Sequence, residues 1–162
     1  MVPALTTSRK PAPGPLPAAL HTARRAVPGA AESELVLDLG PESVQVVLTQ
    51  AGPYSRHVLA AVEERSPSAS LAVVAEPGQL FWVWLITPVA AWDEDPGRTF
   101  RYAQGTVILP PLTRTGPPGA YWVRTPHSRL VDPGVLAGAV REAARGQSSP
   151  VHEVGRLTAE ER

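Results

Sequence analysis

The chain contains no cysteine, a single lysine and few aromatic residues, and these shortages exclude several classes of function. Without cysteine there is no disulfide, no thiolate metal site and no cysteine nucleophile. The histidines are isolated, and none has another potential metal ligand three or four residues away, as a zinc site on a helix requires; they are His21, His57, His127 and His152. We therefore expect no metal ion and no other cofactor.

Recognised catalytic motifs are also missing. The sequence has no Gly-x-Ser-x-Gly elbow, no phosphate-binding loop and no dinucleotide-binding fingerprint. The only dense group of acids, Asp93-Glu94-Asp95, directly precedes Pro96. Such a run is more typical of a solvated turn than of a metal site, in which oxygen atoms converge on one point. We assign no catalytic residue, and the sequence favours a protein without enzymatic activity over a hydrolase with a dispersed triad.

Long apolar runs and an excess of one charge are absent as well. Fifteen basic and fifteen acidic residues cancel, which argues against a uniformly basic coat for nucleic acid. The longest uncharged apolar run, Leu80 to Ile86, is too short to cross a membrane. No apolar stretch follows Arg24 and Arg25 to make a secretion signal. We expect a soluble cytoplasmic protein that does not associate with membranes.

Proline and glycine are abundant, with 19 and 13 residues, and proline marks the domain boundaries. Residues 1–31 hold six prolines, four cations and no acid, which predicts a disordered basic arm. Because this arm offers no apolar face, we expect its deletion to leave the thermal midpoint nearly unchanged. Residues 32–150 are predicted to form one domain, and residues 151–162 a polar tail.

Hydrophobic periodicity within the domain predicts strands and two helices. Ser55 is a plausible N-cap for a helix over Arg56 to Arg65, and Asp132-Pro133 begins a second helix that ends near Gly146. Leu80 to Ile86 is apolar on both faces, which places it at the sheet centre. The predicted strands are Glu34 to Leu39, Val44 to Thr49, Leu71 to Ala75, Gln79 to Ile86, Thr106 to Leu109 and Ala120 to Arg124. The sequence thus predicts an α+β fold with a mixed or antiparallel sheet of five to six strands and two main helices.

Charge is unevenly distributed along the domain, and residues 96–131 contain five arginines and no acid. Aromatic residues alternate with these arginines. Guanidinium groups bind phosphates through a planar fork, and aromatic faces stack on bases. The candidate residues for binding a ligand or nucleic acid are Arg101, Arg114, Tyr121, Trp122, Arg124 and His127. Alternatively, these arginines neutralise the acidic first half of the domain, and Tyr121 or Trp122 points into the core.

Part of this segment resembles a known family. Gly105 to Pro111, a loop rich in glycine and proline, and Gly119 to Val123 resemble the N-terminal domain of bifunctional DNA primase/polymerases, of the archaeo-eukaryotic primase kind. Pro77 to Val83 is similar to the hairpin of that family, so the resemblance covers Leu71 to Val123. Small actinobacterial proteins of unknown function are also similar, and the arginine-rich, lysine-poor composition is typical of a GC-rich source.

The departures from the family pattern fall on its catalytic positions. Leu80 stands where the family has a phosphate-contacting histidine, and Thr99 replaces an acid. Of the family's Asp-x-Asp only Asp38 is present, because Gly40 fills the second place, whereas Arg101 keeps the family's arginine. Polymerases need paired carboxylates to hold two metal ions. The resemblance therefore implies a degenerate active site that should not support primer extension.

Two functions remain open at this point. The first is a non-catalytic binding or accessory module similar to a primase/polymerase domain, with single-stranded nucleic acid as a weakly bound partner. The second is a protein–protein interaction protein of unrelated α+β fold with no nucleic-acid role. The first predicts that Arg101, Arg114 and Arg124 share one exposed face, and the second predicts an exposed apolar patch.

Overall fold

A computed structural model of the chain describes Leu20 and residues 35–67, 71–126 and 130–147. The predicted arm and tail therefore lie outside the described residues, apart from Leu20. The elements, in chain order, are β1 (Leu35–Leu39), β2 (Gln45–Gln50), α2 (Pro53–Arg65), β3 (Val73–Ala75), β4 (Phe81–Ile86), β5 (Thr99–Tyr102), β6 (Gly105–Leu109), β7 (Tyr121–Arg124) and α3 (Pro133–Gln147).

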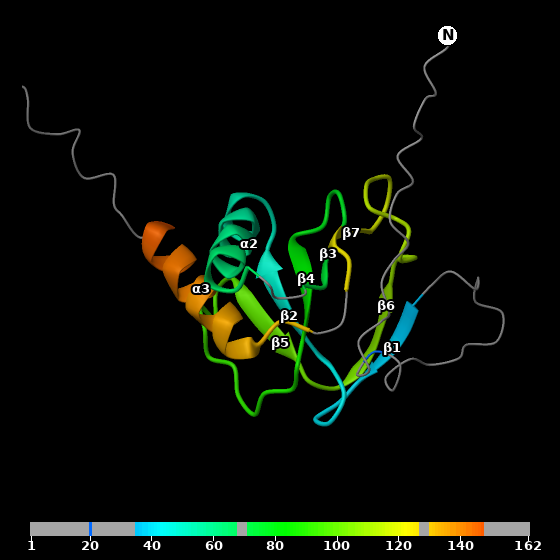
Figure 1. Ribbon diagram of the computed structural model, residues 1–162, viewed down its shortest axis with the longest axis horizontal. Coiled ribbons are helices and arrows are strands. Elements are labelled where there is room, and N and C mark those ends of the chain that lie inside the picture. The colour runs from blue at the N-terminus through cyan, green and yellow to red at the C-terminus, as the bar shows by residue number, and fades with distance from the viewer. Residues whose placement is uncertain (1–19, 21–34, 68–70, 127–129, 148–162) are drawn as a thin grey trace, which may run out of the picture.

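The strands form two antiparallel sheets, which confirms the predicted α+β class. Five strands pair in the order β5-β2-β4-β3-β7, with β4 at the centre as its apolar sequence predicted. The strands β1 and β6 form a separate two-stranded ribbon, in which Leu35 faces Leu109 and Leu39 faces Gly105. The five-stranded sheet lies between the two helices on one side and this ribbon on the other (Figure 1).

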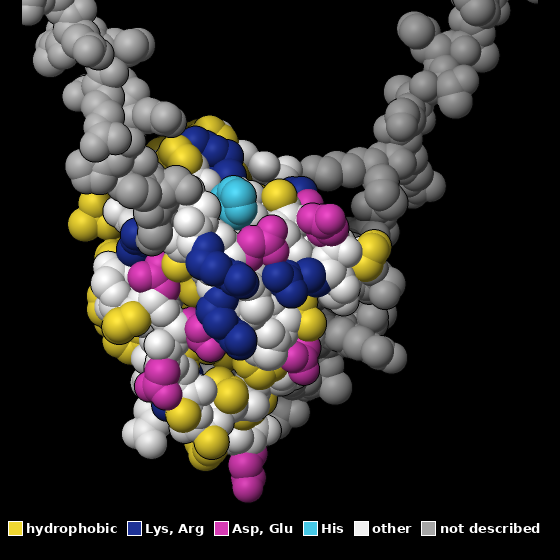
Figure 2. All heavy atoms as spheres, turned by 90° about the vertical axis from the view of Figure 1, so that its left-hand side faces the viewer, with side chains coloured by type: hydrophobic (Ala, Val, Ile, Leu, Met, Phe, Trp, Pro, Cys, Tyr) yellow, Lys and Arg dark blue, Asp and Glu magenta, His cyan; other side chains and the backbone are white. Residues whose placement is uncertain are grey.

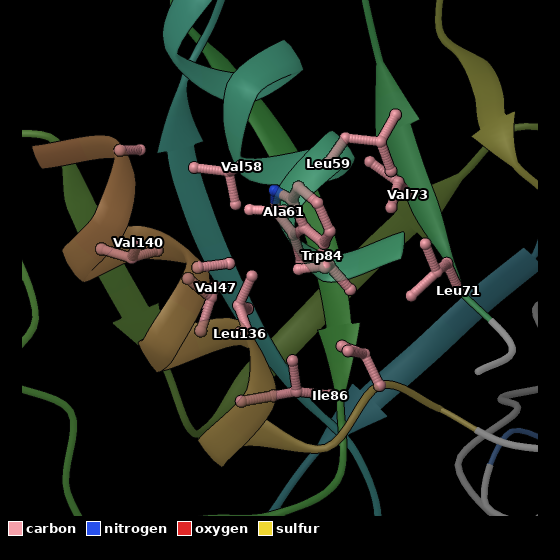
Figure 3. Close-up of a cluster of buried hydrophobic side chains, with 14 of the residues drawn as sticks. Val47, Val58, Leu59, Ala61, Leu71, Val73, Trp84, Ile86, Leu136 and Val140 are labelled. Atoms are coloured by element: carbon pink, nitrogen blue, oxygen red, sulfur yellow. The ribbon is translucent and has the colours of Figure 1, made fainter. Parts of the chain in front are cut away.

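The helix side of the sheet carries the first core cluster. Val47 of β2, Val73 of β3 and Trp84 of β4 are completely buried there under α2 and α3. The Trp84 ring lies at the centre of the cluster, with Val58 and Ala61 of α2 beside it (Figure 3). Alternate residues of each strand point to this face, as the period of two in a strand requires.

The opposite face of the sheet carries the second core cluster. Val46, Val74, Leu85 and Trp122 of the sheet pack there against Leu35, Leu37 and Leu109 of the ribbon. Leu20, the one described residue before β1, is also completely buried in this cluster. The expectation that residues 1–31 contribute no apolar contact is therefore wrong at Leu20, because a single leucine in a proline-rich context shows no periodicity.

The two helices begin differently. Asp132 caps α3 as predicted, because its Oδ1 accepts hydrogen bonds from the backbone N–H groups of Gly134 at 2.8 Å and Val135 at 3.2 Å. The predicted Ser55 cap is wrong, since α2 starts earlier, at Pro53 after Gly52. Gly52 has a φ of 87°, which favours glycine, and proline suits the first helical position. Ser55 lies inside the helix and donates instead to the Gln50 carbonyl at 2.6 Å.

Candidate interaction site

The predicted binding arginines lie on different parts of the fold. Arg101 belongs to β5 and Arg124 to β7, the two opposite edges of the five-stranded sheet. Arg114 is exposed in the loop between β6 and β7, where its carbonyl accepts a hydrogen bond from the Trp122 N–H at 2.9 Å. The structure thus brings Arg114 near β7 and separates Arg101 from Arg124.

Two of these arginines have partners within the domain. The Arg101 guanidinium donates to the Val89 carbonyl and lies 3.5 Å from Gln45 Oε1, which also accepts the Val89 N–H at 3.1 Å. Arg124 pairs with Glu63 of α2 at 2.6 Å. The Arg124–Glu63 pair agrees with the alternative that these arginines neutralise the acidic first half of the domain, whereas Arg101 contacts a carbonyl and an amide oxygen.

The predicted aromatic residues differ in accessibility. Trp122 is only 1% exposed, and its indole N–H donates to the Pro110 carbonyl at 3.0 Å inside the second core cluster. Tyr121 is half-buried on β7, and His127 lies outside the described residues. Trp122 therefore offers no open ring face on which a base could stack.

Charged side chains on the helix side are mixed in sign. Arg65 of α2 pairs with Glu142 of α3 at 2.7 Å, and Arg141 of α3 pairs with Glu94 at 3.1 Å. Figure 2 shows the side of the molecule on which α3 lies, and basic and acidic side chains are intermixed there. This side presents no surface of one charge in that view.

Exposed aromatic rings gather instead at the β5 edge of the other sheet face. Phe100 and Tyr102 of β5 are 43% and 54% exposed, and Phe81 of β4 is half-buried beside them. The Phe81 and Phe100 rings meet edge to face, with their centroids 5.6 Å apart. We call Phe81, Phe100 and Tyr102 the aromatic patch.

The aromatic patch lies on the sheet face that the ribbon covers elsewhere. Phe100 is opposite Leu48, and Tyr102 is opposite Val46, so both rings lie on the face of the second core cluster. Leu48 and Val83, next to Phe100 in register, are only partly buried there. The described chain therefore leaves apolar surface open at this corner of the sheet.

An open pocket of about 430 Å³ lies against the same strand. It is formed on one side by β5 and on the other by the loop that precedes β5. The lining residues are Trp92, Asp93, Glu94, Pro96, Thr99, Phe100, Arg101 and Tyr102. Two members of the aromatic patch thus border a hollow at the edge of the sheet.

The loop beside the pocket is anchored by its acids. Asp95 accepts a hydrogen bond from the Tyr54 hydroxyl at 2.7 Å, and Arg98 lies 3.8 Å from the Asp95 carboxylate and over the Tyr54 ring. Burial, together with the Asp95 carboxylate, raises the pKa of Tyr54 above its usual value. Glu94 pairs with Arg141, so the predicted solvated turn is half-buried at two of its three acids.

Asp93 is the exception in this loop. It is exposed, and the described part of the chain gives its carboxylate no ion pair. The Thr99 hydroxyl completes the anchoring, since the Trp92 indole N–H donates to Thr99 Oγ1 at 2.9 Å. The pocket therefore presents one unpaired negative charge beside two exposed aromatic rings.

The remaining acid of the primase-like pattern lies elsewhere. Asp38 is on β1, in the ribbon, and its Oδ1 accepts a hydrogen bond from Thr106 Oγ1 at 3.0 Å. Within residues 35–67, 71–126 and 130–147, no three acids or histidines gather as metal ligands would. Nor does any helix in those ranges have the length and apolar character to span a bilayer.

Sequence reasoning named Arg101 as a candidate but did not predict the strand β5, and so it did not find the site as a whole. The residues Thr99-Phe-Arg-Tyr alternate between a face turned to the helices and a face with both exposed rings, which is the signal of a strand. The run is only four residues long and follows an acidic loop, so it did not stand out. Comparison with protein-family models, curated proteins and solved structures gives no match for this chain.

Proposed function

We propose that this chain is a non-catalytic protein-interaction module that docks a partner protein on the aromatic patch. The observation that supports the proposal is the exposure of Phe100 and Tyr102 beside partly open apolar surface. Contiguous exposed apolar surface marks interaction sites on monomeric proteins, and aromatic residues are enriched in the cores of interfaces. This is the feature that the protein-interaction hypothesis requires.

Charge around the aromatic patch favours a protein over a nucleic acid. Exposed rings on a sheet also suit base stacking, but such sites combine stacking with cations that track the phosphates. Here the nearest cations, Arg98 and Arg101, contact Asp95 and the Val89 carbonyl respectively, while Asp93 is unpaired. A polyanion gains little from this arrangement, whereas a partner protein can supply an apolar surface with a matching cation.

Photo-crosslinking from the aromatic patch tests the proposal. A photo-reactive phenylalanine analogue replaces Phe100 in the full chain, which is expressed in cells of its source. The matched control carries the analogue at Ile108, which is 67% exposed on the ribbon. We expect a discrete, protease-sensitive adduct from position 100, none from position 108, and loss of the adduct when Tyr102→Lys is added.

Other outcomes would contradict the proposal. Equal cross-linking from both positions would show nonspecific contact. An adduct that nuclease removes would instead support the single-stranded nucleic acid hypothesis. In that case the association constant should fall as the salt concentration rises. Each cation that contacts a phosphate should contribute roughly −0.7 to the slope of its logarithm against the logarithm of the salt concentration. Template-dependent primer extension would overturn the non-catalytic part of the proposal.

A further inference from the structure

We propose, building on the protein-interaction function above, that β5 is a strand-addition site for an extended, cationic segment of the partner. In this mode a peptide adds a strand to an exposed sheet edge, main-chain hydrogen bonds supply affinity, and alternate side chains supply specificity. The β5 strand combines an open edge, flanking rings and an unpaired carboxylate.

The register shows which main-chain groups of β5 face outward. The Gln50 N–H donates to the Arg98 carbonyl at 2.9 Å, and opposed residues of an antiparallel pair alternate between bonded and non-bonded pairs. Phe100 therefore turns its N–H and carbonyl toward β2, and Arg101 turns its own outward. The outward Thr99 N–H is already used, since it donates to the Asp95 carbonyl at 2.9 Å.

These outward groups are open in the described chain. No other described residue bonds the main chain of Arg101, and β5 is the last strand at its edge of the sheet. The pocket of about 430 Å³ runs beside the same residues and is bordered by the loop at residues 92–96. An added strand would bond Arg101 and place alternate side chains against Phe100 and Tyr102.

The opposite edge of the sheet is less suited to strand addition. The β7 strand pairs with β3 through an irregular register, with a shift between Val73 and Val74. Bulges and irregular pairing are among the devices that protect sheet edges from pairing with other chains. We therefore place the added strand on β5.

Charge identifies the kind of segment that fits. Asp93 lines the pocket without an ion pair in the described chain, and the Arg101 guanidinium is held by the Val89 carbonyl. A second copy of this chain would bring another exposed Asp93, and its pocket cation Arg101 is half-buried and hydrogen-bonded to the Val89 carbonyl. A partner strand that carries lysine or arginine among apolar residues matches the edge better.

Hydrogen exchange with a model peptide provides the first test. The probe is a short, end-capped peptide of alternating valine and lysine, added to the full-length protein. We expect it to slow exchange of the Arg101 amide while leaving the Phe100 amide, which already faces β2, nearly unchanged. A valine–glutamate peptide and a valine–lysine peptide with N-methylated backbone amides serve as controls, and neither should protect Arg101.

Substitutions at position 101 separate the contribution of the main-chain N–H to peptide binding from that of the arginine side chain. Arg101→Pro removes an outward N–H but no bond to β2, and proline is tolerated on edge strands. Arg101→Ala is the matched control, because it also loses the guanidinium contacts but keeps the N–H. We expect peptide binding to be roughly fivefold weaker in Arg101→Pro than in Arg101→Ala. Asp93→Asn should weaken it roughly threefold at low salt.

The results distinguish this inference from the function on which it rests. Protection on β7 instead of β5, or binding of the N-methylated peptide, would overturn strand addition at β5. Cross-linking from position 100 that persists unchanged in Arg101→Pro would also overturn it while leaving the docking function intact. If position 100 gives no specific adduct in the native chain, the docking function itself fails. Should Arg101→Pro not fold, the N-methylated peptide decides the question.

Discussion

At the scale of single residues, hydroxyl groups under α2 hold the helix to the sheet. Thr49 Oγ1 accepts a hydrogen bond from the Trp84 indole N–H at 2.7 Å and lies 2.6 Å from Ser55 Oγ. All three side chains are buried, and each polar atom has a partner. Because an unsatisfied buried donor costs more than its bond contributes, these contacts fix the position of the large Trp84 ring.

The buried hydroxyl of Thr49 should be important for stability. Thr49→Val keeps the shape of the side chain but leaves the Trp84 N–H without its acceptor, so the free energy of unfolding should fall by about 1–3 kcal/mol. Urea denaturation measures this loss. Thr49→Ser, which retains the hydroxyl and loses only a methyl group, should be the milder change. A larger loss in Thr49→Ser would show that packing, and not the hydrogen bond, is decisive.

The Tyr54 hydroxyl should make stability depend on alkaline pH. Its pKa is raised in the folded state, so its contribution is fully present below the unfolded value of about 10 and is lost as the pH rises above it. At neutral pH, Tyr54→Phe should lower the free energy of unfolding by about 1–2 kcal/mol, because the bond to Asp95 is lost. Denaturation at increasing pH should show the two proteins converge above about pH 10. A gap that does not change with pH would contradict this assignment.

At the scale of secondary-structure elements, local sequence decides where a helix begins, and the neighbouring elements decide which contacts its residues make. Asp132 and Pro133 start α3 without help from the rest of the fold. The α2 helix begins at a glycine with positive φ, and its Ser55 hydroxyl bonds β2 instead of capping the helix. Asp132 and Ser55, both of types that favour N-caps, therefore differ in role: the first acts locally as a cap and the second makes a tertiary contact.

The cap of α3 can be tested directly. Asp132→Ala removes the acceptor of two backbone N–H groups, so the free energy of unfolding should fall by about 1 kcal/mol. Asp132→Asn, which is also a good N-cap, should restore most of this loss. Thermal and urea denaturation measure both variants. Equal destabilisation by alanine and asparagine would show that the charge, and not the cap, stabilises the helix.

At the scale of the whole molecule, the five-stranded sheet is the middle of three layers, with the two helices on one side and the β1–β6 ribbon on the other (Figure 1). The helices cover one face along most of β2 and β4, where Val47, Trp84 and Ile86 are completely buried and Trp82 is half-buried. The ribbon covers only part of the other face, and the aromatic patch lies at the corner that it leaves open. The candidate site is therefore a consequence of how far the ribbon reaches.

Leu20 should link the segment before β1 to global stability. It is completely buried in the second core cluster, so Leu20→Ala should lower the free energy of unfolding by about 2–5 kcal/mol. The matched control is Leu80→Ala, at a leucine that is 74% exposed, where a change within about 0.5 kcal/mol is expected. Calorimetry measures both. An unchanged midpoint for Leu20→Ala would restore the expectation that residues 1–31 do not pack.

The sequence alone determined the elements whose signals are local. Apolar residues on both faces placed Leu80 to Ile86 at the sheet centre, and Glu76-Pro77-Gly78 placed the hairpin turn. Asp132-Pro133 located the start of α3. Periodicity and turn chemistry act over a few residues, so one sequence is enough to show them.

Only the tertiary structure decided which faces are covered. Alternation shows that Phe100 and Tyr102 share a face, but it cannot show where the β1–β6 ribbon ends. For the same reason the sequence placed Trp122, which the ribbon side buries, among the candidate site residues and left out Phe100 and Tyr102, whose rings stay exposed. Pairing between residues far apart in the chain sets both the coverage of a sheet and the partners of its arginines, and no local pattern encodes it.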